Sequence, residues 1–179
     1  MIEIYCGDGK GKTTAAAGLA LRAAGNGIPV LFLQFMKEGS SGEMKMLKTL
    51  PGVKVGYPDP FYGFASTMNE QQKEEMRRQY KELLDTALQA LENQKNADSK
   101  QGVSLVVVLD EVIHACNKKL LKEEALLKLL EECPDNTEVV LTGRNPSKSL
   151  LEKADYISEI EKRRHPFDRG ISARKGIEL

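Results

Sequence analysis

The residues of this chain best suited to chemistry form a glycine-rich segment near its start, Gly7-Asp8-Gly9-Lys10-Gly11-Lys12-Thr13-Thr14. An apolar run, Ile2–Cys6, precedes the segment, and an alanine-rich stretch over 15–24 follows it. Glycines let backbone N–H groups turn toward an anion, and the N-terminus of a following helix adds partial positive charge. Strand, glycine-rich turn and helix together predict a phosphate-binding loop (P-loop) for a nucleotide.

The lysine and threonine that end this loop have defined roles in such sites. We expect Lys12 to reach the outer phosphates and the Thr13 hydroxyl to ligate Mg²⁺. The usual spacing, G-x-x-x-x-G-K-[ST], would put a glycine where the chain has Cys6, and the first glycine is Gly7. The loop is therefore one residue short, which predicts a phosphate seat unlike that of ordinary ATPases. The alternative is a structural turn with an incidental lysine.

Two carboxylates follow the most apolar run of the chain. Residues 105–109 read Leu-Val-Val-Val-Leu and lead into Asp110 and Glu111. A buried parallel strand delivers such acids at the carboxyl edge of its sheet, where ligands bind. We expect Asp110 or Glu111 to bind Mg²⁺ directly or through water, opposite Thr13. The pair could instead supply a general base that activates water, or be two solvated acids at a strand end.

Weaker candidates lie at other strand ends and in the tail. Gln34 follows a strand and is either a substrate contact or a loop hydrogen-bonder, and Arg144 is either a phosphate ligand or a surface ion-pair partner. Arg22 either reaches the nucleotide or is solvated. Residues 162–175 hold six Lys or Arg against one Asp, and their His165 is a polar contact or a structural histidine.

Length, charge and cysteine content fit a compact enzyme. The 179 residues predict one domain, and 26 basic residues balance 26 acidic ones, so no net field attracts nucleic acid or a membrane. No apolar stretch is long enough to span a membrane. Three widely spaced cysteines, Cys6, Cys116 and Cys133, fit reduced buried thiols better than disulfides or a zinc site. We expect a cytoplasmic protein.

Apolar runs alternate with helical patterns, which is typical of a parallel sheet covered on both faces. We therefore predict an α/β, single-domain P-loop (RecA-like) fold, mostly parallel, over residues 1–179. The predicted strands are Ile2–Cys6, 29–34, 105–109, 138–141 and Tyr156–Glu159. Four helices are predicted: one after the P-loop, one over about 70–94, one over about 120–132, and a short one that begins at Pro146 with Asn145 as its cap.

Three stretches complete this outline. In the long helix, apolar residues recur every three or four positions and predict a core-facing stripe: Met76, Tyr80, Leu83, Leu84, Ala87, Leu88 and Leu91. Residues 51–66 hold three prolines and four aromatics and are expected to be irregular, and 93–101 to be a solvated loop.

These motifs, in this order and almost end to end, resemble the P-loop ATP:corrinoid adenosyltransferases, also called cob(I)alamin adenosyltransferases. The resemblance rests on the short loop and on Arg22-Ala23-Ala24-Gly25, Gln34-Phe35-Met36-Lys37, Leu109-Asp110-Glu111, Leu141-Thr142-Gly143-Arg144, Ala154-Asp155, Ser158-Glu159, Arg164-His165-Pro166-Phe167-Asp168, Gly170-Ile171, Ala173 and Gly176-Ile177-Glu178.

The resemblance implies transfer of the 5′-deoxyadenosyl group of ATP to the cobalt of a corrinoid. In this family Co(I) of a corrinoid attacks C5′ of ATP and expels triphosphate, as in adenosylcobalamin formation, and the nucleotide is held in the reverse sense to other P-loop proteins. Lys10, Lys12, the loop amides and Mg²⁺ would stabilise charge on the leaving group. By the same resemblance Thr13 and Glu111 hold the metal and Arg22 lies near the nucleotide.

One departure concerns an aromatic loop. Relatives carry a Phe-x-Trp pair that presses on the lower face of the corrin, and this chain has no tryptophan. The nearest equivalent is Tyr62-Gly63-Phe64, with Phe61 as an alternative, and the competing interpretation is aromatics that pack a loop onto the core. The resemblance further implies a homodimer, a flavin- or flavodoxin-type reductant, and a basic segment, 162–179, that packs near the site. Because the chain starts almost at the first strand, we expect it to lack the N-terminal extension with which some relatives cover the site.

Two other classes of protein share a P-loop. A small kinase or ATPase would act at the γ-phosphate and normally shows an arginine-bearing lid, whereas the basic stretch here lies in the tail. A non-catalytic nucleotide-binding module or nucleic-acid motor fits poorly with zero net charge. Release of triphosphate rather than orthophosphate separates the transferase from both.

Overall fold

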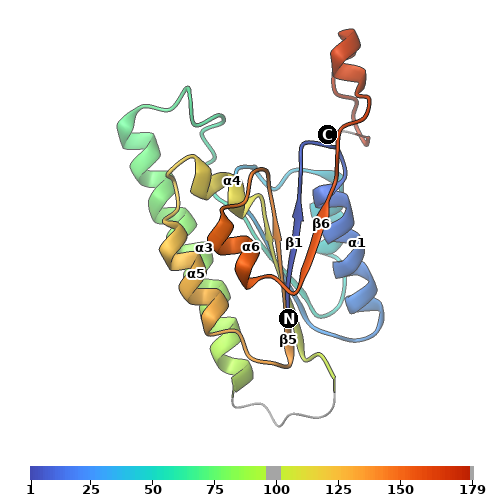
Figure 1. Cartoon of the computed structure of the whole chain (residues 1–179), viewed down its shortest axis with the longest axis vertical. Coiled ribbons are helices and arrows are strands. Elements are labelled where there is room, and N and C mark those ends of the chain that lie inside the picture. Colours follow the sequence, from blue (N-terminus) through green and yellow to red (C-terminus); the bar gives the residue numbers. More distant parts are fainter. Residues whose placement is uncertain (96–101, 178–179) are drawn as a thin grey trace.

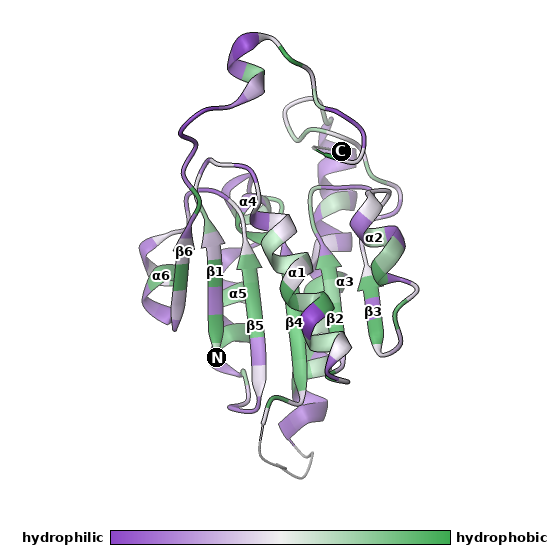
Figure 2. Ribbon diagram, turned by 90° about the vertical axis from the view of Figure 1, so that its right-hand side faces the viewer, coloured by the Kyte–Doolittle hydropathy of each residue, from purple (hydrophilic) through white to green (hydrophobic). Residues whose placement is uncertain are grey.

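A single parallel sheet forms the centre of the molecule in the computed structural model, which describes residues 1–95 and 102–177. Its six strands lie side by side in the order β3-β2-β4-β5-β1-β6 and all run in the same direction (Figure 2). Their bounds are β1 Ile2–Cys6, β2 Val30–Gln34, β3 Val53–Gly56, β4 Leu105–Asp110, β5 Thr137–Thr142 and β6 Tyr156–Glu159.

Helices cover both faces of this sheet (Figures 1 and 2). α1 and α2 pack on one face, and α3, α4, α5 and α6 contribute to the core on the other. The bounds are α1 Lys12–Gly25, α2 Gly42–Leu47, α3 Glu70–Lys95, α4 Val112–Asn117, α5 Glu123–Glu131 and α6 Lys148–Lys153, with a 3₁₀ turn, η1, over Pro166–Arg169. None of the helices in the described part of the chain is long and apolar enough to cross a membrane.

Side chains alternate between the two faces of the sheet along each strand, so the apolar residues of the strands contribute to two separate cores, one on each face. On the α1 face, Phe32 and Val108 meet the alanines Ala16 and Ala20, whose small side chains let the helix lie close to the sheet. On the α3 face, Leu33 and its neighbours meet the buried stripe of the long helix, which consists of Met76, Tyr80, Leu84, Ala87 and Leu91. Since every strand from β1 to β5 is anchored in this way, the carboxyl ends of the strands are fixed relative to one another.

The fold prediction is confirmed, and its errors concern short elements. The five predicted strands are present, but β3, α2 and α4 lie where irregular chain or no element was expected. The interpretation of 51–66 as wholly irregular is therefore wrong at Val53–Gly56. The predicted cap Asn145 is also wrong, because Ser147 caps α6 by accepting a bond from the Leu150 N–H at 3.2 Å. Of the predicted loop 93–101, residues 93–95 continue α3, and 96–101 lie outside the described residues.

β6 is an edge strand, and the chain beyond it leaves the body of the molecule. All four residues of β6 are exposed. Of residues 161–177, only His165 and Pro166 are even partly buried, and the segment extends from the end of the molecule where the strands finish (Figures 1 and 2). Residues 178–179 lie outside the described residues.

The three cysteines are free, as predicted. Burial raises the pKa of the Cys116 thiol to about 12 and also raises the pKa of Cys6 and Cys133. The thiolate is the reactive form, so all three side chains are held in their unreactive state at neutral pH.

We therefore expect iodoacetamide at pH 8 to modify none of the three cysteines of the folded protein within a time that fully modifies the protein in guanidinium chloride. Intact mass spectrometry counts the adducts. Rapid single labelling of the native protein would contradict the assignment of all three as unreactive structural thiols.

Candidate active site

The carboxylate of Asp110 lies where the ends of three neighbouring strands meet α1. Asp110 ends β4 and its side chain is fully buried. Its Oδ1 accepts hydrogen bonds from the hydroxyls of Thr13 at 2.8 Å and Thr142 at 2.7 Å. Its Oδ2 accepts bonds from the Gln34 amide at 3.0 Å and from the Lys37 ammonium at 3.2 Å. Four donors from four different elements therefore converge on one carboxylate.

These donors explain why a carboxylate tolerates complete burial. A buried charge is strongly unfavourable unless it is paired and hydrogen-bonded. Here one cation and three neutral donors occupy the two oxygens of Asp110. Thr142 has a second role, because its hydroxyl also accepts the backbone N–H of Glu111 at 2.8 Å. The end of β5 thus fixes both the side chain of Asp110 and the backbone that follows it.

The lysine of the P-loop is hydrogen-bonded to backbone carbonyls of the same loop. The Lys12 Nζ donates to the carbonyls of Gly7 and Gly9, each at 2.8 Å, and its side chain is almost completely buried. Burial lowers the pKa of Lys12, and the neighbouring Glu111 carboxylate partly offsets that effect. No side chain caps the N-terminus of α1 at Gly11, so the first N–H groups of the helix remain available to an anion.

The chain beyond β6 packs directly on this loop. The Gly9 N–H donates to the Ile160 carbonyl at 2.7 Å, and the Lys162 N–H donates to the Asp8 carboxylate at 2.9 Å, which is the main reason that the pKa of Asp8 is lowered. A Cβ added to Gly7 would approach the Ile160 carbonyl oxygen to 2.4 Å. Glycine is required there by the close backbone approach as well as by its positive φ.

Glu111 and Arg144 lie on the loops that flank this centre. Glu111 has a left-handed backbone conformation with φ of 60°, and among the described residues its carboxylate makes no hydrogen bond. Arg144 is exposed, and the Asn117 side chain holds its loop by donating to the Arg144 carbonyl at 2.8 Å. The charge of Arg144 adds to the lowering of the pKa of Lys12, so this guanidinium acts on the P-loop.

The residues around Thr13 fit a divalent cation that is bound together with a nucleotide. P-loop proteins hold Mg²⁺ with one hydroxyl, one carboxylate, phosphate oxygens and water, so a cluster of three acids is not needed; none was found in the described residues. A cation already lies between Thr13 and Asp110, namely the Lys37 ammonium. The buried Gln34 Oε1 has no hydrogen-bond partner among the described residues and would accept a bond from a metal-bound water.

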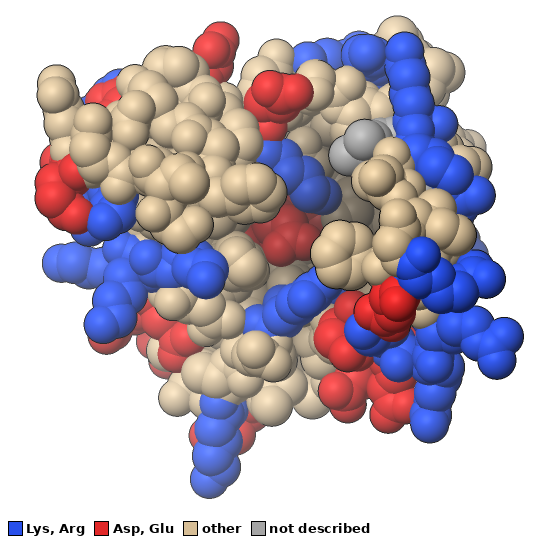
Figure 3. Space-filling model, turned by 90° about the horizontal axis from the view of Figure 1, so that it is seen from above, with Lys and Arg blue, Asp and Glu red and all other residues tan. Residues whose placement is uncertain are grey.

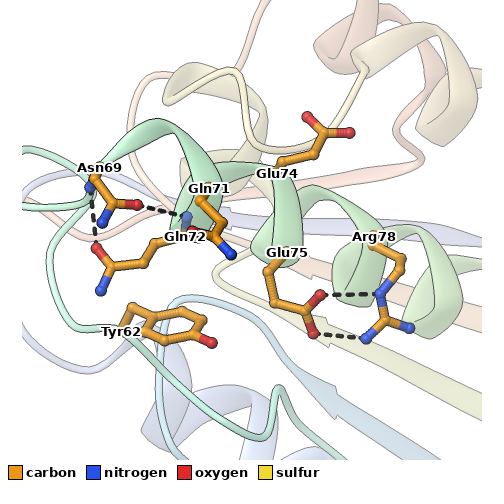
Figure 4. A pocket seen from close by; sticks show the side chains of 7 residues that line it. All are labelled: Tyr62, Asn69, Gln71, Gln72, Glu74, Glu75 and Arg78. Atoms are coloured by element: carbon orange, nitrogen blue, oxygen red, sulfur yellow. Dashed lines mark hydrogen bonds and ion pairs between the residues drawn. The ribbon is translucent and has the colours of Figure 1, made fainter.

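The three predicted aromatic residues have different surroundings. Phe61 and Tyr62 are partly buried and pack on the core, whereas Phe64 has 80% of its surface exposed. Tyr62 faces a polar hollow of about 650 Å³ beside the first turns of α3 (Figure 4), lined also by Asn69, Gln71, Gln72, Glu74, Glu75 and Arg78. The interpretation as core-packing aromatics therefore fits Phe61 and Tyr62, and the interpretation as a contact surface fits Phe64.

The structure does not bring every predicted residue to the site. Arg22 lies in the last turn of α1, about 15 Å along the helix axis from Lys12, since each residue adds about 1.5 Å. His165 caps η1 by accepting the Phe167 N–H at 3.1 Å, which matches the structural interpretation of this histidine. Lys10 and Thr14 belong to the loop itself and are exposed.

Two residues at the centre received no role from the sequence. Thr142 and Lys37 both contact Asp110, and only their positions after apolar strands pointed to this edge of the sheet. Seen from that edge, Asp and Glu side chains lie near the middle of the surface with Lys and Arg on either side (Figure 3). This mixture of charges suits a triphosphate together with a metal ion.

Comparison with known proteins agrees with the site. Residues 1–179 match the family model "ATP:corrinoid adenosyltransferase BtuR/CobO/CobP". The corrinoid adenosyltransferase of Escherichia coli K12 is 35% identical over 99% of this chain and 85% of its own length, and that of Sinorhizobium sp is 31% identical over 100% and 80%. Corrinoid adenosyltransferase CobA of Salmonella typhimurium is 31% identical over 99% and 85%.

Solved structures with a similar fold are P-loop ATPase domains. EssC (ATPases 2 and 3) of Geobacillus thermodenitrificans superimposes with a TM-score of 0.51 at 15% identity, over 99% of this chain and 36% of that one. The cytoplasmic domain of EssC gives 0.52 at 15% identity, over 96% and 35%. At this identity the likeness concerns the fold alone.

The double role of Thr142 leads to a stability prediction. Thr142→Val removes a donor to Asp110 and the acceptor of the Glu111 N–H, so we expect a loss of about 2–3 kcal/mol in the free energy of unfolding, measured with urea. Thr142→Ser keeps the hydroxyl and serves as the control, with a loss below about 1 kcal/mol. Equal losses in both variants would mean that the methyl group, and not the hydroxyl, matters.

Proposed function

The chain belongs to the ATP:corrinoid adenosyltransferase family, a family of transferases that adenosylate corrinoids with ATP, and we propose how its residues divide that work. The observation that carries the proposal is the junction of the P-loop with Thr13 and Asp110 at the carboxyl edge of the sheet. In the reaction, the Co(I) electron pair forms the bond to C5′ of ATP. The C5′–O bond breaks, and triphosphate leaves with its electron pair.

The P-loop binds the leaving group. The Lys12 ammonium, which is bonded to the Gly7 and Gly9 carbonyls, exchanges these partners for phosphate oxygens when ATP enters. The open N–H groups at the start of α1 donate to the same phosphates. Because negative charge grows on the α-phosphate oxygen as the C–O bond breaks, donors fixed in advance lower the barrier without any protein nucleophile.

Thr13 and a carboxylate hold Mg²⁺ in this proposal. The Thr13 hydroxyl would be a direct ligand, and Asp110, which is bonded to that hydroxyl, would orient it and bind the metal directly or through a water molecule. Glu111 supplies a second carboxylate at the edge of the site. When bound, Mg²⁺ neutralises the triphosphate and makes it a better leaving group. Arg144 adds a further positive charge facing the loop.

Phe64 and the tail define the side on which the corrinoid binds. The segment between β3 and α3 lies at the same end of the molecule as the P-loop, and its exposed ring is suited to cover the apolar face of a flat macrocycle (Figure 1). The exposed tail, which carries Phe167, Ile171 and Ile177, is the surface with which we expect a second copy of the chain to form a homodimer. A flavin- or flavodoxin-type donor supplies the electron that makes Co(I).

Product analysis tests the function. Anaerobic incubation of the protein with ATP, Mg²⁺ and chemically reduced cob(I)alamin should give a light-sensitive alkylcobalamin spectrum, with intact triphosphate as the phosphorus-31 product. Orthophosphate or pyrophosphate without a photolabile product would show instead that the loop directs attack to phosphorus.

A comparison of two exposed apolar side chains, Phe64 and Met46, tests the role of Phe64. Phe64→Ala should lower turnover at least about tenfold when Co(II) must be reduced on the enzyme, and much less when Co(I) is supplied, because the ring would exclude the lower ligand. Met46→Ala, which removes an exposed apolar side chain from α2, is the control for the loss of an apolar surface. Equal losses for Phe64→Ala under both conditions would contradict a role on the lower face.

A further inference from the structure

Lys37 occupies the space between the two groups that the proposed function assigns to the metal. Its Nζ lies 3.0 Å from the Thr13 Oγ1 and 3.2 Å from the Asp110 Oδ2. The carboxylate is fully buried, whereas 37% of the lysine side-chain surface is exposed. The Lys37 side chain therefore extends from solvent to the Asp110 carboxylate, and it can withdraw toward solvent by the same route.

The direction of the hydrogen bonds around Thr13 leaves a lone pair of its hydroxyl oxygen facing a cation. The Thr13 hydroxyl donates its only proton to Asp110 Oδ1, so it can only accept from Lys37. A lone pair of that oxygen thus points at the ammonium, and a metal ligand also presents a lone pair. On the other carboxylate oxygen, Lys37 is the only charged partner among the described residues.

The backbone before Lys37 is held in place from β4 and from α3. The Phe35 N–H donates to the Asp110 carbonyl at 2.8 Å, and the Met36 N–H donates to the Tyr80 hydroxyl at 2.9 Å. Met36 has a left-handed conformation with φ of 57°, which is unfavourable for a side chain of this kind unless its surroundings enforce it. The buried Tyr80 enforces this turn, and the turn directs Lys37 back over the end of β2.

We propose that Lys37 is a built-in counter-cation that fills the metal seat of the nucleotide-free protein and must withdraw before a divalent cation can bind. This inference rests on the proposed metal role of Thr13 and Asp110. The ammonium and the metal compete for the same two oxygens, and two cations a few ångströms apart repel strongly in a buried site. A divalent cation alone offers Lys37 no new partner, whereas a metal–nucleotide complex brings phosphate oxygens that accept the displaced ammonium.

The consequence is an order of binding. Free Mg²⁺ is kept out of the empty site, and the metal enters only together with the triphosphate. Lys37 also keeps the buried Asp110 charge paired until that moment, so the empty site is stable without a metal. After the exchange, the lysine adds a positive charge near the leaving triphosphate.

Manganese binding to the nucleotide-free protein tests this order. Titration with Mn²⁺, followed by electron paramagnetic resonance of the free ion, should show only weak binding to the wild-type protein. Lys37→Met should bind one Mn²⁺ at least about tenfold more tightly, because a competing charge and a steric block are removed. Lys45→Met removes a lysine from the exposed face of α2 and should behave as the wild type.

A double variant tests whether the Mn²⁺ bound by Lys37→Met lies at Asp110. Lys37→Met/Asp110→Asn should lose the tight Mn²⁺ binding, since the carboxylate that holds the ion is gone. Melting temperature is the second readout: Lys37→Met should melt roughly 5 °C below the wild type because a buried charge loses its partner, and Mn²⁺ should restore most of that difference. Circular dichroism confirms that each variant is folded, and Lys37→Gln replaces Lys37→Met if the latter is not.

Equal Mn²⁺ affinity in the wild type and in the folded Lys37 variant would overturn the proposal, as would tight binding that survives the loss of Asp110. The measurement uses neither ATP nor a corrinoid. Its failure would therefore leave adenosyl transfer intact, and failure of the product analysis would leave the competition between Lys37 and the metal to be judged on its own.

Discussion

The burial of the Asp110 carboxylate is the constraint on which the rest of the site depends. A fully buried charge requires donors on both oxygens, and the chain supplies them from α1, the end of β2, the loop after β2, and the end of β5. These elements also carry other parts of the site: α1 begins with Lys12, and the Thr142 hydroxyl at the end of β5 holds the backbone N–H of Glu111. The same contacts therefore tie the P-loop, the Lys37 side chain and the Glu111 backbone together.

A second constraint acts on the other side of the P-loop. The backbone of Ile160 lies so close to Gly7 and Gly9 that neither position has room for a side chain. The short loop is thus shaped from outside by the strand β6 and the chain that follows it, not only by its own glycines. This packing links the tail to the phosphate seat, and it accounts for the hydrogen bond that holds Asp8.

The sequence was sufficient for the parts of this account that depend on local pattern. Apolar runs predicted five of the six strands, the four central ones and the edge strand β6, and the glycine-rich segment before an alanine-rich helix predicted the P-loop. The sequence did not reveal the roles of Thr142 and Lys37. Thr142 reaches Asp110 because β5 lies beside β4, and Lys37 reaches it because of the left-handed turn at Met36. The short strand β3 was missed since four residues among prolines and glycines give almost no periodic signal.

A crystal structure of the protein with ATP and Mg²⁺ tests most directly that this loop binds the triphosphate as a leaving group. The account predicts that Lys12 has left the Gly7 and Gly9 carbonyls for phosphate oxygens, that Thr13 ligates the metal in place of Lys37, and that C5′ faces the open side near Phe64. A nucleotide bound with C5′ buried and its γ-phosphate exposed to an acceptor would contradict it.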